Sequence, residues 1–321
     1  MKKNTKALFT LAIGEPYQRM WETYCRPNWE AYACRHGYDI VVVDQLITHQ
    51  EDAHRRPPHW QKCFILSHPR AGDYEDVVYL DSDIMINYRH APCVVTANRA
   101  GYIGAVKFDH YLDDDLNAYL IAIRKSNFLT YNKRAAMRRA DNRPAILPTA
   151  DFSSYYGLYM PGQDESALPR VNSGLLVMKP AVHRERLETI YMQSFEEARD
   201  EWVNGEIEID QTFLTWKLLQ AGLIHLLDER FNRIAAFEHA IHYPFTLIHP
   251  EETLMRMCFT SMLHNSYFLH FARCQSMMKY ALVNADEDFA IVGLPNVFAG
   301  DRVTIRHRRS KSGAANPIEM G

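Results

Sequence analysis

Long apolar runs are missing from this sequence of 321 residues. Nowhere do about 18 apolar residues follow one another, as a membrane-spanning helix requires, so we expect no transmembrane segment. The apolar run at 7–13 is too short for a secretory signal and is interrupted by Thr10, and no small-residue cleavage site follows it. We therefore expect a cytoplasmic protein, and leave open whether it works at the surface of a membrane.

Paired cysteines and an excess of charge of one sign are missing as well. The six cysteines include no C-x-x-C pair, which argues against a disulfide framework or a zinc site and favours small buried side chains in a reducing compartment. The formal net charge of −3 gives no basis for a surface that binds nucleic acid or anionic lipid through bulk charge. A hydrophobic content of 47% and a charged content of 23% are ordinary for a soluble globular enzyme.

What is present is an alternation of apolar strands and helical patterns, beginning with a βαβ unit. The expected strands are 6–13, 39–43, 77–86, 102–106, 174–178 and 267–272, and the expected helices are 17–36, 61–67, 182–203 and 210–221. Pro27 is expected to kink or split its helix. This order predicts an α/β fold, Rossmann-like, with a mainly parallel central sheet flanked by helices.

The pattern changes after the first four strands, which suggests how the chain is organised. Basic helical sequence and a loop rich in Tyr, Gly and Pro predict an insertion, and its part at 151–163 is expected to act as a lid. The tail is basic and then small and polar, which favours disorder. We expect one domain at 1–300, made of a nucleotide-binding half (6–107), the insertion (108–170) and an acceptor half (171–285), followed by the tail (301–321).

Two carboxylates lie in the stretch VVYLDSDIMI, at 77–86. Asp81 and Asp83 are two apart, so in an extended chain both point to the same side. Two like charges beside a buried strand are costly unless something positive lies on them. A hard divalent cation that bridges them to a pyrophosphate would meet that need, and ligands bind outside the carboxyl ends of strands in open α/β sheets. The plain alternative is a solvated loop with two capping aspartates.

Two other enzyme classes place a D-x-D pair after an apolar strand. Haloacid-dehalogenase-like phosphatases require Thr or Val two residues after the second Asp, where this chain has Met85, although LDDDL at 112–116 could imitate their later acidic motif. Their motif is also usually nearer the N-terminus. A polymerase-like nucleotidyltransferase would have a Gly-Ser dipeptide before the pair, and none lies upstream. The phosphatase remains an alternative.

Six segments in order make the chain resemble the metal-dependent nucleotide-sugar glycosyltransferases of the GT-A fold. The patterns are most similar to those of the retaining galactosyl-, xylosyl- and glucosyltransferases. The segments are ALFTLAIG (7–14), the W-x-K of Trp60 to Lys62, YLDSD (79–83), NSGLLVMK (172–179), DQTFL (210–214) and FLHF (268–271). The region 108–170 matches no pattern of the family, which leaves the acceptor open.

The resemblance implies a metal site. The resemblance implies that Asp81 contacts the donor ribose and the metal and that Asp83 binds the metal directly. It also implies that His270 supplies a third ligand from the C-terminal side. An imidazole in the ligand set favours Mn²⁺ over Mg²⁺. The plain alternative for His270 is a surface or core residue, because the chain has 15 histidines.

The remaining donor contacts follow the same resemblance. Thr10, Ala12 and Tyr17 would lie by the nucleoside, with Tyr17 either stacking on the base or filling the core. Lys62 would reach the diphosphate or ribose as a point charge, unless it is a solvated lysine. The other implied positions are Asn172, Ser173 and Gly174 at the sugar hydroxyls or in a plain turn, and Arg273 and Lys279 at the diphosphate.

Asp210 and Gln211 open the helix at 210–221. Asp210 is a plausible N-cap, and in the retaining families an Asp-Gln at this place faces the donor sugar. Because Gln is a poor nucleophile, a front-face displacement with retention fits better than a covalent intermediate. The expected function is Mn²⁺-dependent transfer of a hexose or pentose from a UDP-sugar to a glycan, lipid or protein hydroxyl. A non-catalytic protein that binds sugar nucleotides or glycans on the same scaffold is the other alternative.

Overall fold

The structure is a computed structural model of the chain and describes residues 4–48, 57–107, 171–197, 209–248, 250–272 and 274–281. The expected insertion at 108–170, with its lid and its LDDDL segment, lies outside the described residues. So do the expected tail at 301–321, the last part of the helix expected at 182–203, and Arg273.

The centre of the fold is a six-stranded sheet with the order β2-β1-β3-β6-β5-β7. Its strands are β1 (Lys6–Leu11), β2 (Tyr38–Val43), β3 (Asp76–Leu80), β5 (Ile103–Lys107), β6 (Val171–Met178) and β7 (Ile224–Leu227). The pairs β1–β2, β1–β3 and β5–β7 are parallel, and β6 is antiparallel to both of its neighbours. The predicted α/β fold with a mainly parallel central sheet is confirmed, apart from the reversed β6.

Both faces of this sheet are buried, because apolar side chains point alternately to either side of each strand. On β1, Ala7 and Phe9 belong to one hydrophobic cluster, and Leu8 between them belongs to the other. On β3, Val77 and Val78 divide between the two clusters in the same way. An apolar run without polar alternation is therefore what an internal strand of this sheet requires.

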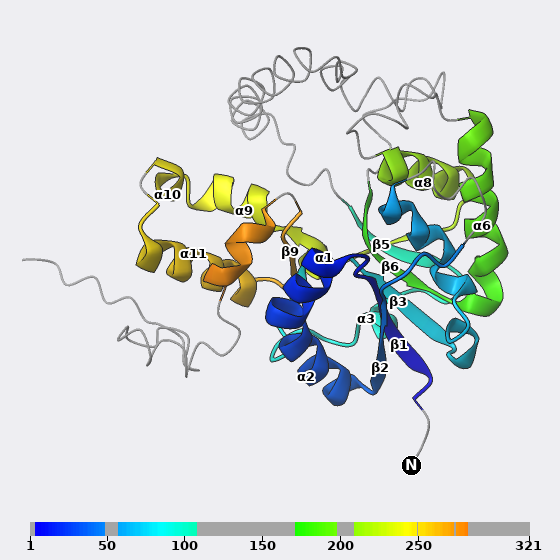
Figure 1. The fold of residues 1–321 in the computed structure, drawn as a ribbon, viewed down its shortest axis with the longest axis horizontal. Helices are drawn as coiled ribbons and strands as arrows, with labels where there is room; N and C mark the ends of the chain where they lie inside the picture. Colours follow the sequence, from blue (N-terminus) through cyan, green and yellow to red (C-terminus); the bar gives the residue numbers. More distant parts are fainter. Residues whose placement is uncertain are drawn as a thin grey trace, which may run out of the picture. The chain divides into compact units, whose positions relative to one another are not determined.

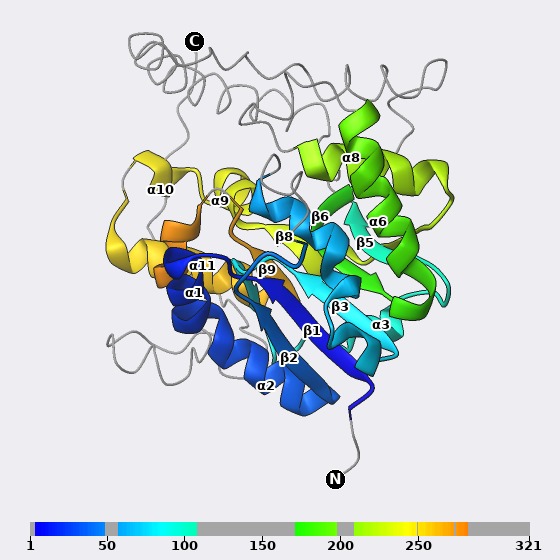
Figure 2. The same cartoon turned by 45° about the vertical axis from the view of Figure 1, so that its right-hand side comes forward.

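Helices cover both faces (Figure 1). The 3₁₀ helix η3 (Pro58–Ser67), α6 (Pro180–Glu197) and α8 (Ile209–Gln220) contribute to the cluster that holds Phe9. The segment α1 (Glu15–Met20), the π-helical turn η1 (Trp21–Cys25) and α2 (Arg26–His36) lie on the other side, where α2 packs on β2 (Figure 2). Two short helices, η4 (Ala71–Asp73) and α3 (Val94–Ala97), lie in connections.

A second, three-stranded sheet is formed by residues that are far apart in the sequence. Its strands are β4 (Ile84–Ile86), β9 (Phe268–His270) and β8 (Arg233–Ile234), in that order. Helical segments surround it, with α11 packed against both α9 and β9. They are η7 (Glu229–Asn232), α9 (Ala235–His242), α10 (Phe245–Ile248), α11 (Glu252–His264) and η8 (Gln275–Tyr280). This small sheet ties the C-terminal part of the described chain to the segment just after β3.

Several expected elements differ from those observed. The turn expected at Asn172 to Gly174 is wrong, because these residues belong to strand β6 (Val171–Met178). The single strand expected at 77–86 is wrong, because the chain turns at 81–83 and its last part joins the second sheet as β4. The helix expected at 17–36 is interrupted by η1 before Pro27, which then lies in the first turn of α2, where a missing N–H costs nothing. The helix expected at 61–67 begins at Pro58 and is 3₁₀.

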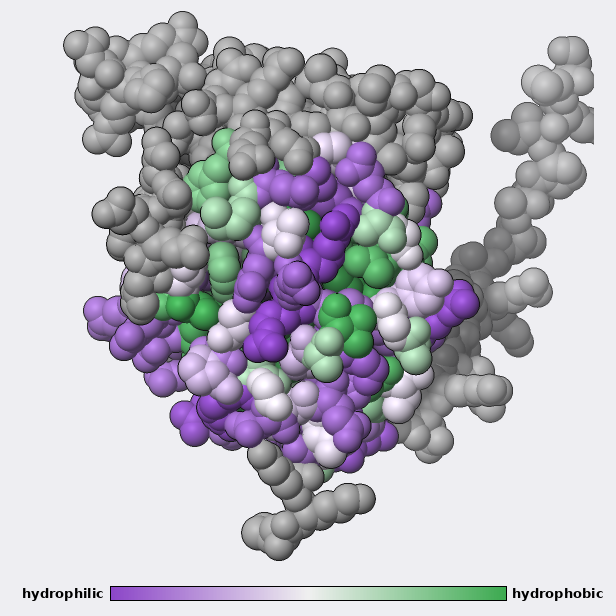
Figure 3. All heavy atoms as spheres, turned by 90° about the vertical axis from the view of Figure 1, so that its right-hand side faces the viewer, coloured by the Kyte–Doolittle hydropathy of each residue, from purple (hydrophilic) through white to green (hydrophobic). Residues whose placement is uncertain are grey.

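No helix of the described chain is long and apolar enough to cross a membrane. On the face shown in Figure 3, the described residues are mostly hydrophilic, and apolar side chains appear in small separate groups. All six cysteines are free, and Cys25, Cys63 and Cys258 are buried as expected. Cys34 is exposed, so the expectation of burial is wrong for that residue.

Gly37 ends α2 in a left-handed conformation, with φ of 70°, and donates its backbone N–H to Ala33. We expect Gly37→Ala to lower the free energy of unfolding by about 1–2 kcal/mol, the usual cost of that conformation for a residue with a Cβ atom. Urea unfolding followed by circular dichroism would measure the change. Gly72→Ala is the matched control, since Gly72 has open space around the Cβ position and no positive φ. Equal effects of the two substitutions would contradict this account.

Candidate metal and donor site

The candidate site lies where parallel strands of the central sheet end. Asp81 directly follows β3, and its backbone N–H donates to the carbonyl of Gly174 at 2.8 Å. Because β6 runs antiparallel to β3, its first residues lie at the edge where β3 ends, with Leu80 opposite Leu175. The reversal of β6 therefore brings the segment Asn172 to Gly174 beside the carboxylates.

The turn after β3 brings the third expected ligand to the same place. After Asp83 the chain continues as β4, which pairs with β9 so that Ile84 lies opposite His270. The backbone N–H of Phe271 also donates to the carbonyl oxygen of Asp83 at 3.0 Å. The pairing of two short strands thus sets the histidine against the carboxylates, across a long separation in sequence.

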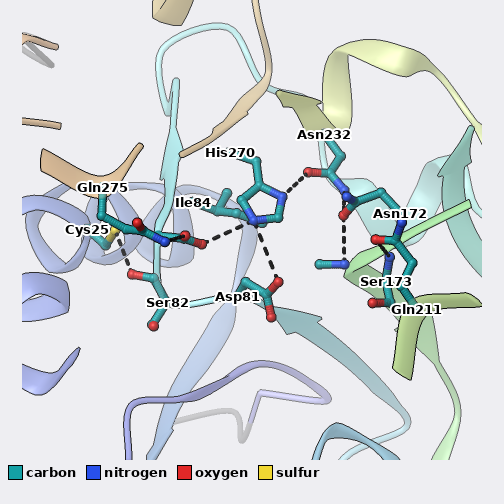
Figure 4. A network of polar contacts seen from close by, with 12 residues as sticks. Cys25, Asp81, Ser82, Ile84, Asn172, Ser173, Gln211, Asn232, His270 and Gln275 are labelled. Carbon is teal, nitrogen blue, oxygen red and sulfur yellow. Dashed lines mark hydrogen bonds and ion pairs between the residues drawn. The ribbon is translucent and has the colours of Figure 1, made fainter. Parts of the chain in front are cut away.

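Asp81, Asp83 and His270 form a group that could hold a metal ion, with one ligand atom from each within 4.8 Å of the others. The Nε2 atom of His270 lies 3.6 Å from Oδ2 of Asp81 (Figure 4). The same atom lies 3.1 Å from Oδ1 of Asp83. The amide of Gln275 donates to Oδ2 of Asp83 at 2.8 Å. Two carboxylates and an imidazole make a donor set that suits Mn²⁺ and related divalent ions, so these residues fit the expected metal.

The opposite charges in this group shift the pKa values of Asp83 and His270. Burial would raise the pKa of Asp83, but the positive charge and hydrogen bond of His270 hold it below its ordinary value. Burial would lower the pKa of His270, but the carboxylates of Asp83 and Asp81 raise it above its ordinary value. In the protonated ring, the proton on Nε2 lies between the histidine and the carboxylates, where a metal ion would bind, so metal binding would release that proton.

Gly174 leaves the room that the group needs. A Cβ atom at this position would lie 2.4 Å from Cε1 of His270 and 2.8 Å from Oδ2 of Asp81. These distances are shorter than real Cβ contacts, so any side chain would displace the histidine, the carboxylate or β6 itself. The glycine of the NSG segment is accordingly required for close approach of β6 to the site.

A second buried charge pair lies next to the first group. Nζ of Lys62 is 2.8 Å from Oδ2 of Asp210 and 3.7 Å from Oδ1 of Asp81, and it donates to Oγ of Ser173 at 3.1 Å. The Lys62 side chain is only 4% exposed, so the alternative of a solvated lysine is wrong. Burial would lower the pKa of Lys62, but the two carboxylates raise it. Burial would raise the pKa of Asp210, but Lys62 and then His59 lower it.

Gln211 is fixed from the same edge of the sheet. It follows Asp210 in the first turn of α8, and its Oε1 accepts the backbone N–H of Ser173 at 3.3 Å. Asn172 is buried, and its Oδ1 accepts the backbone N–H of Gly174 at 2.8 Å. The residues expected at the donor sugar are therefore neighbours of the carboxylate group, although they come from different elements.

The positions expected at the nucleoside lie on and after β1. Thr10 is buried, and among the described residues its Oγ1 has no hydrogen-bond partner. Ala12 is buried and donates its backbone N–H to Val43 at 2.9 Å. Tyr17 is 55% exposed, so the alternative that it fills the core is wrong. Lys279 is exposed, with its ammonium 4.9 Å from the centre of the Tyr280 ring, and its place at the diphosphate stays a prediction.

Four residues of the site were not foreseen from the sequence. They are His59, Tyr79, Asn232 and Gln275. Tyr79 donates to Oδ1 of Asp81 at 2.5 Å, and His59 lies 3.4 Å from Asp210. The three-residue spacing of His59 and Lys62 could have linked them, because residues i and i+3 line up in a 3₁₀ helix. Asn232 and Gln275 carry no local signal, since each acts through a partner that is distant in the sequence.

Comparison with known proteins finds no matching family model and no matching curated protein. Solved structures with a similar fold include a glycosyltransferase involved in the glycosylation of the major capsid of PBCV-1 (TM-score 0.45, 11% identity, 85% of this chain and 98% of that chain). Galactosyltransferase LgtC with donor and acceptor sugar analogues gives a TM-score of 0.44 at 11% identity, over 86% of this chain and 96% of that one. The apo structure of the bifunctional glycosyltransferase WbbM gives a TM-score of 0.48 at 11% identity. The match covers 91% of this chain and 52% of WbbM, so this chain spans about half the length of WbbM.

The Lys62–Asp210 pair predicts a pH-dependent contribution to stability. At neutral pH, Asp210→Asn should lower the free energy of unfolding by about 3 kcal/mol, the lower end for breaking a buried pair, because Asp81 still faces the ammonium. The pKa of Asp210 is lower in the folded state, so its contribution is complete above the unfolded-state pKa of about 4. The contribution is lost as the pH falls through the folded-state pKa.

Urea unfolding of the wild-type protein and the variant over a series of pH values would measure this difference. Glu30→Gln is the control, since Glu30 and Arg26 form an exposed i,i+4 pair that is worth at most about 0.5 kcal/mol. A difference between the wild-type protein and Asp210→Asn that persists unchanged into strong acid would contradict the assignment.

Proposed function

We propose that this protein is a glycosyltransferase that moves a sugar from a nucleotide-sugar donor to an acceptor hydroxyl with the help of a divalent metal ion. One observation carries the proposal: Asp81, Asp83 and His270 converge at the edge of a buried α/β sheet, directly beside Asp210 and Gln211. Neither group alone is specific. Together they supply a place for a diphosphate and a place for the sugar next to it.

The charge of the site supports a divalent ion. Three carboxylates, those of Asp81, Asp83 and Asp210, share the permanent cation of Lys62 and the imidazole of His270. With the imidazole neutral, two negative charges remain, which a divalent cation balances. Bound there, the ion would act as a Lewis acid that stabilises negative charge on the leaving diphosphate. We propose Mn²⁺ because of the imidazole, with Mg²⁺ as the second choice.

The donor is proposed to be a UDP-sugar, which the resemblance to the retaining GT-A families favours. Its nucleoside would lie along Thr10, Ala12 and Tyr17. Thr10 has a buried hydroxyl without a hydrogen-bond partner among the described residues, and Tyr17 has an exposed aromatic ring. Its ribose and diphosphate would lie at the carboxylate group. Arg273 and Lys279 are proposed as further cations at the diphosphate.

The sugar would lie between β6 and the start of α8. The resemblance implies a place for Lys62 at the diphosphate or ribose. We propose instead that it holds the Asp210 carboxylate in place, because its ammonium already has Asp210 and Ser173 as partners. One lone pair of Gln211 Oε1 is occupied by the Ser173 N–H, which weakens it further as a nucleophile. With Asp210 held by Lys62 and Gln211 held by Ser173, neither residue is well suited to attack the sugar as a nucleophile. A front-face displacement with retention is therefore favoured. The acceptor oxygen bonds to the anomeric carbon as the bond to the diphosphate breaks, and a phosphate oxygen takes the acceptor proton.

The wider organisation belongs to the proposal as well. One glycosyltransferase domain would occupy 1–300, with a nucleotide-binding half at 6–107, the insertion at 108–170 and an acceptor half at 171–285. The part of the insertion at 151–163 is proposed to close over the donor. The acceptor is a hydroxyl of a glycan, lipid or protein, and a cytoplasmic location is proposed. Hydrolysis of UDP-sugars in the presence of Mn²⁺ would separate an enzyme from a protein that only binds the nucleotide.

Loss of a metal ligand should abolish the effect of Mn²⁺ on nucleotide binding. We expect UDP to raise the melting temperature of the wild-type protein when Mn²⁺ is present, because a ligand that binds only the folded state stabilises it. Asp83→Asn and His270→Ala should remove most of that increase. His183→Ala is the matched control, since His183 is also buried but bonds to Lys179 and Gly101 instead. Equal increases in all three variants would contradict the metal site.

The position of Gln211 predicts the stereochemistry. The product should keep the anomeric configuration of the donor, which NMR of the first-formed product would measure once a sugar donor is found. Gln211→Ala should lower kcat more than it raises KM, as expected for a contact made mainly in the transition state. Inversion of configuration would overturn the retaining mechanism whatever the variant does.

A further inference from the structure

Asn232 connects the candidate metal ligands with the residues expected at the donor sugar. It ends η7, directly before β8, and is only 1% exposed. Its Oδ1 lies 3.0 Å from Nδ1 of His270, and its Nδ2 donates to Oδ1 of Asn172 at 2.8 Å (Figure 4). One buried side-chain amide therefore contacts both a candidate metal ligand and a residue of the candidate sugar site.

The orientation of both amides follows from a single backbone group. The N–H of Gly174 can only donate, so the atom of Asn172 that it contacts at 2.8 Å must be the oxygen. That oxygen can only accept, so the atom of Asn232 that faces it must be the NH₂ nitrogen. The other end of the Asn232 amide, which faces His270, is then the carbonyl oxygen.

The same reasoning continues into the imidazole ring. A carbonyl oxygen cannot donate, so Nδ1 of His270 must carry a proton. In the neutral ring the lone pair is then on Nε2, which is the nitrogen that faces Asp81 and Asp83. Only that tautomer can offer a ligand atom to an ion held by the two carboxylates.

We propose that Asn232 is a positioning residue that fixes His270 in its metal-binding tautomer, with its own orientation set through Asn172 by the backbone N–H of Gly174. The inference rests on the proposed function, since it assigns a role toward the proposed metal ion. Loss of the partner that bonds to the second nitrogen of a metal-binding histidine typically lowers the metal affinity by about 10- to 100-fold. The chain of bonds also joins the sugar side of the site to the metal side through buried amides.

The tautomer can be measured in the wild-type protein itself. Long-range ¹H–¹⁵N NMR of protein labelled with ¹⁵N-histidine, in alkaline buffer without metal, reports which ring nitrogen carries the proton, and His270→Gln assigns the signal. We expect the proton on Nδ1 of His270. A proton on Nε2 in the neutral ring would overturn the proposal, and no variant has to fold for this test.

Two substitutions of Asn232 then separate its two bonds. Asn232→Leu removes both and should weaken Mn²⁺ binding, measured by EPR of the free ion, by about 10- to 100-fold. Asn232→Asp keeps an acceptor for the Nδ1 proton and should bind Mn²⁺ within a few-fold of wild type. Asn87→Leu is the matched control, because Asn87 is also buried and, within the part of the chain that the structure describes, its side chain bonds only to the carbonyls of His264 and Ser266. It should lower the melting temperature and leave Mn²⁺ binding unchanged.

The outcomes distinguish this proposal from the proposed function. If His270→Ala loses Mn²⁺ and a folded Asn232→Leu binds it like wild type, the role of Asn232 is wrong and the metal site stands. If His270→Ala itself binds Mn²⁺ normally, both the metal site and the proposed function are wrong. A loss of Mn²⁺ binding in Asn87→Leu equal to that in Asn232→Leu would reduce the effect of Asn232 to general destabilisation and would overturn the proposal.

Discussion

The structure depends on how three buried or half-buried carboxylates are compensated at one edge of the central sheet. Asp81, Asp83 and Asp210 could not share this place without positive partners, because desolvation of an unpaired charge costs several kcal/mol. Lys62 lies on η3 and His270 lies on β9, so two elements far apart in the sequence provide the positive partners. The pairing of charges at the candidate site therefore also contributes to the stability of the fold.

Two irregular features of the fold, the reversed β6 and the turn at 81–83, lie at this site. The reversed β6 brings the backbone of Gly174 against Asp81, and the absence of a Cβ atom there lets His270 approach. The turn at 81–83 directs the chain from the central sheet into the second one, where β4 meets β9. The reversed β6 and the turn at 81–83 both lie where polar groups of the site are placed.

The network also suggests how the parts of the site act together. Ser173 receives the Lys62 ammonium on its hydroxyl and gives its backbone N–H to Gln211, while Asn172 is linked through Asn232 to His270. Two neighbouring residues of β6 are thus linked to different parts of the site, Ser173 to Lys62 and Gln211, and Asn172 through Asn232 to His270. A small movement of β6 would change both, which is the arrangement expected where bond cleavage requires metal and sugar to be placed together.

The sequence by itself determined the α/β class, since apolar runs with helical patterns between them have few other ways to bury both faces of a sheet. It also indicated the candidate ligands, because a D-x-D after such a run and a late FLHF are local patterns. Only the tertiary structure decided that the strand breaks at Asp81, that Lys62 is buried, and that Asn232 holds His270. These outcomes depend on pairings between segments far apart in the chain, and neither periodicity nor spacing within one segment carries information about such a partner.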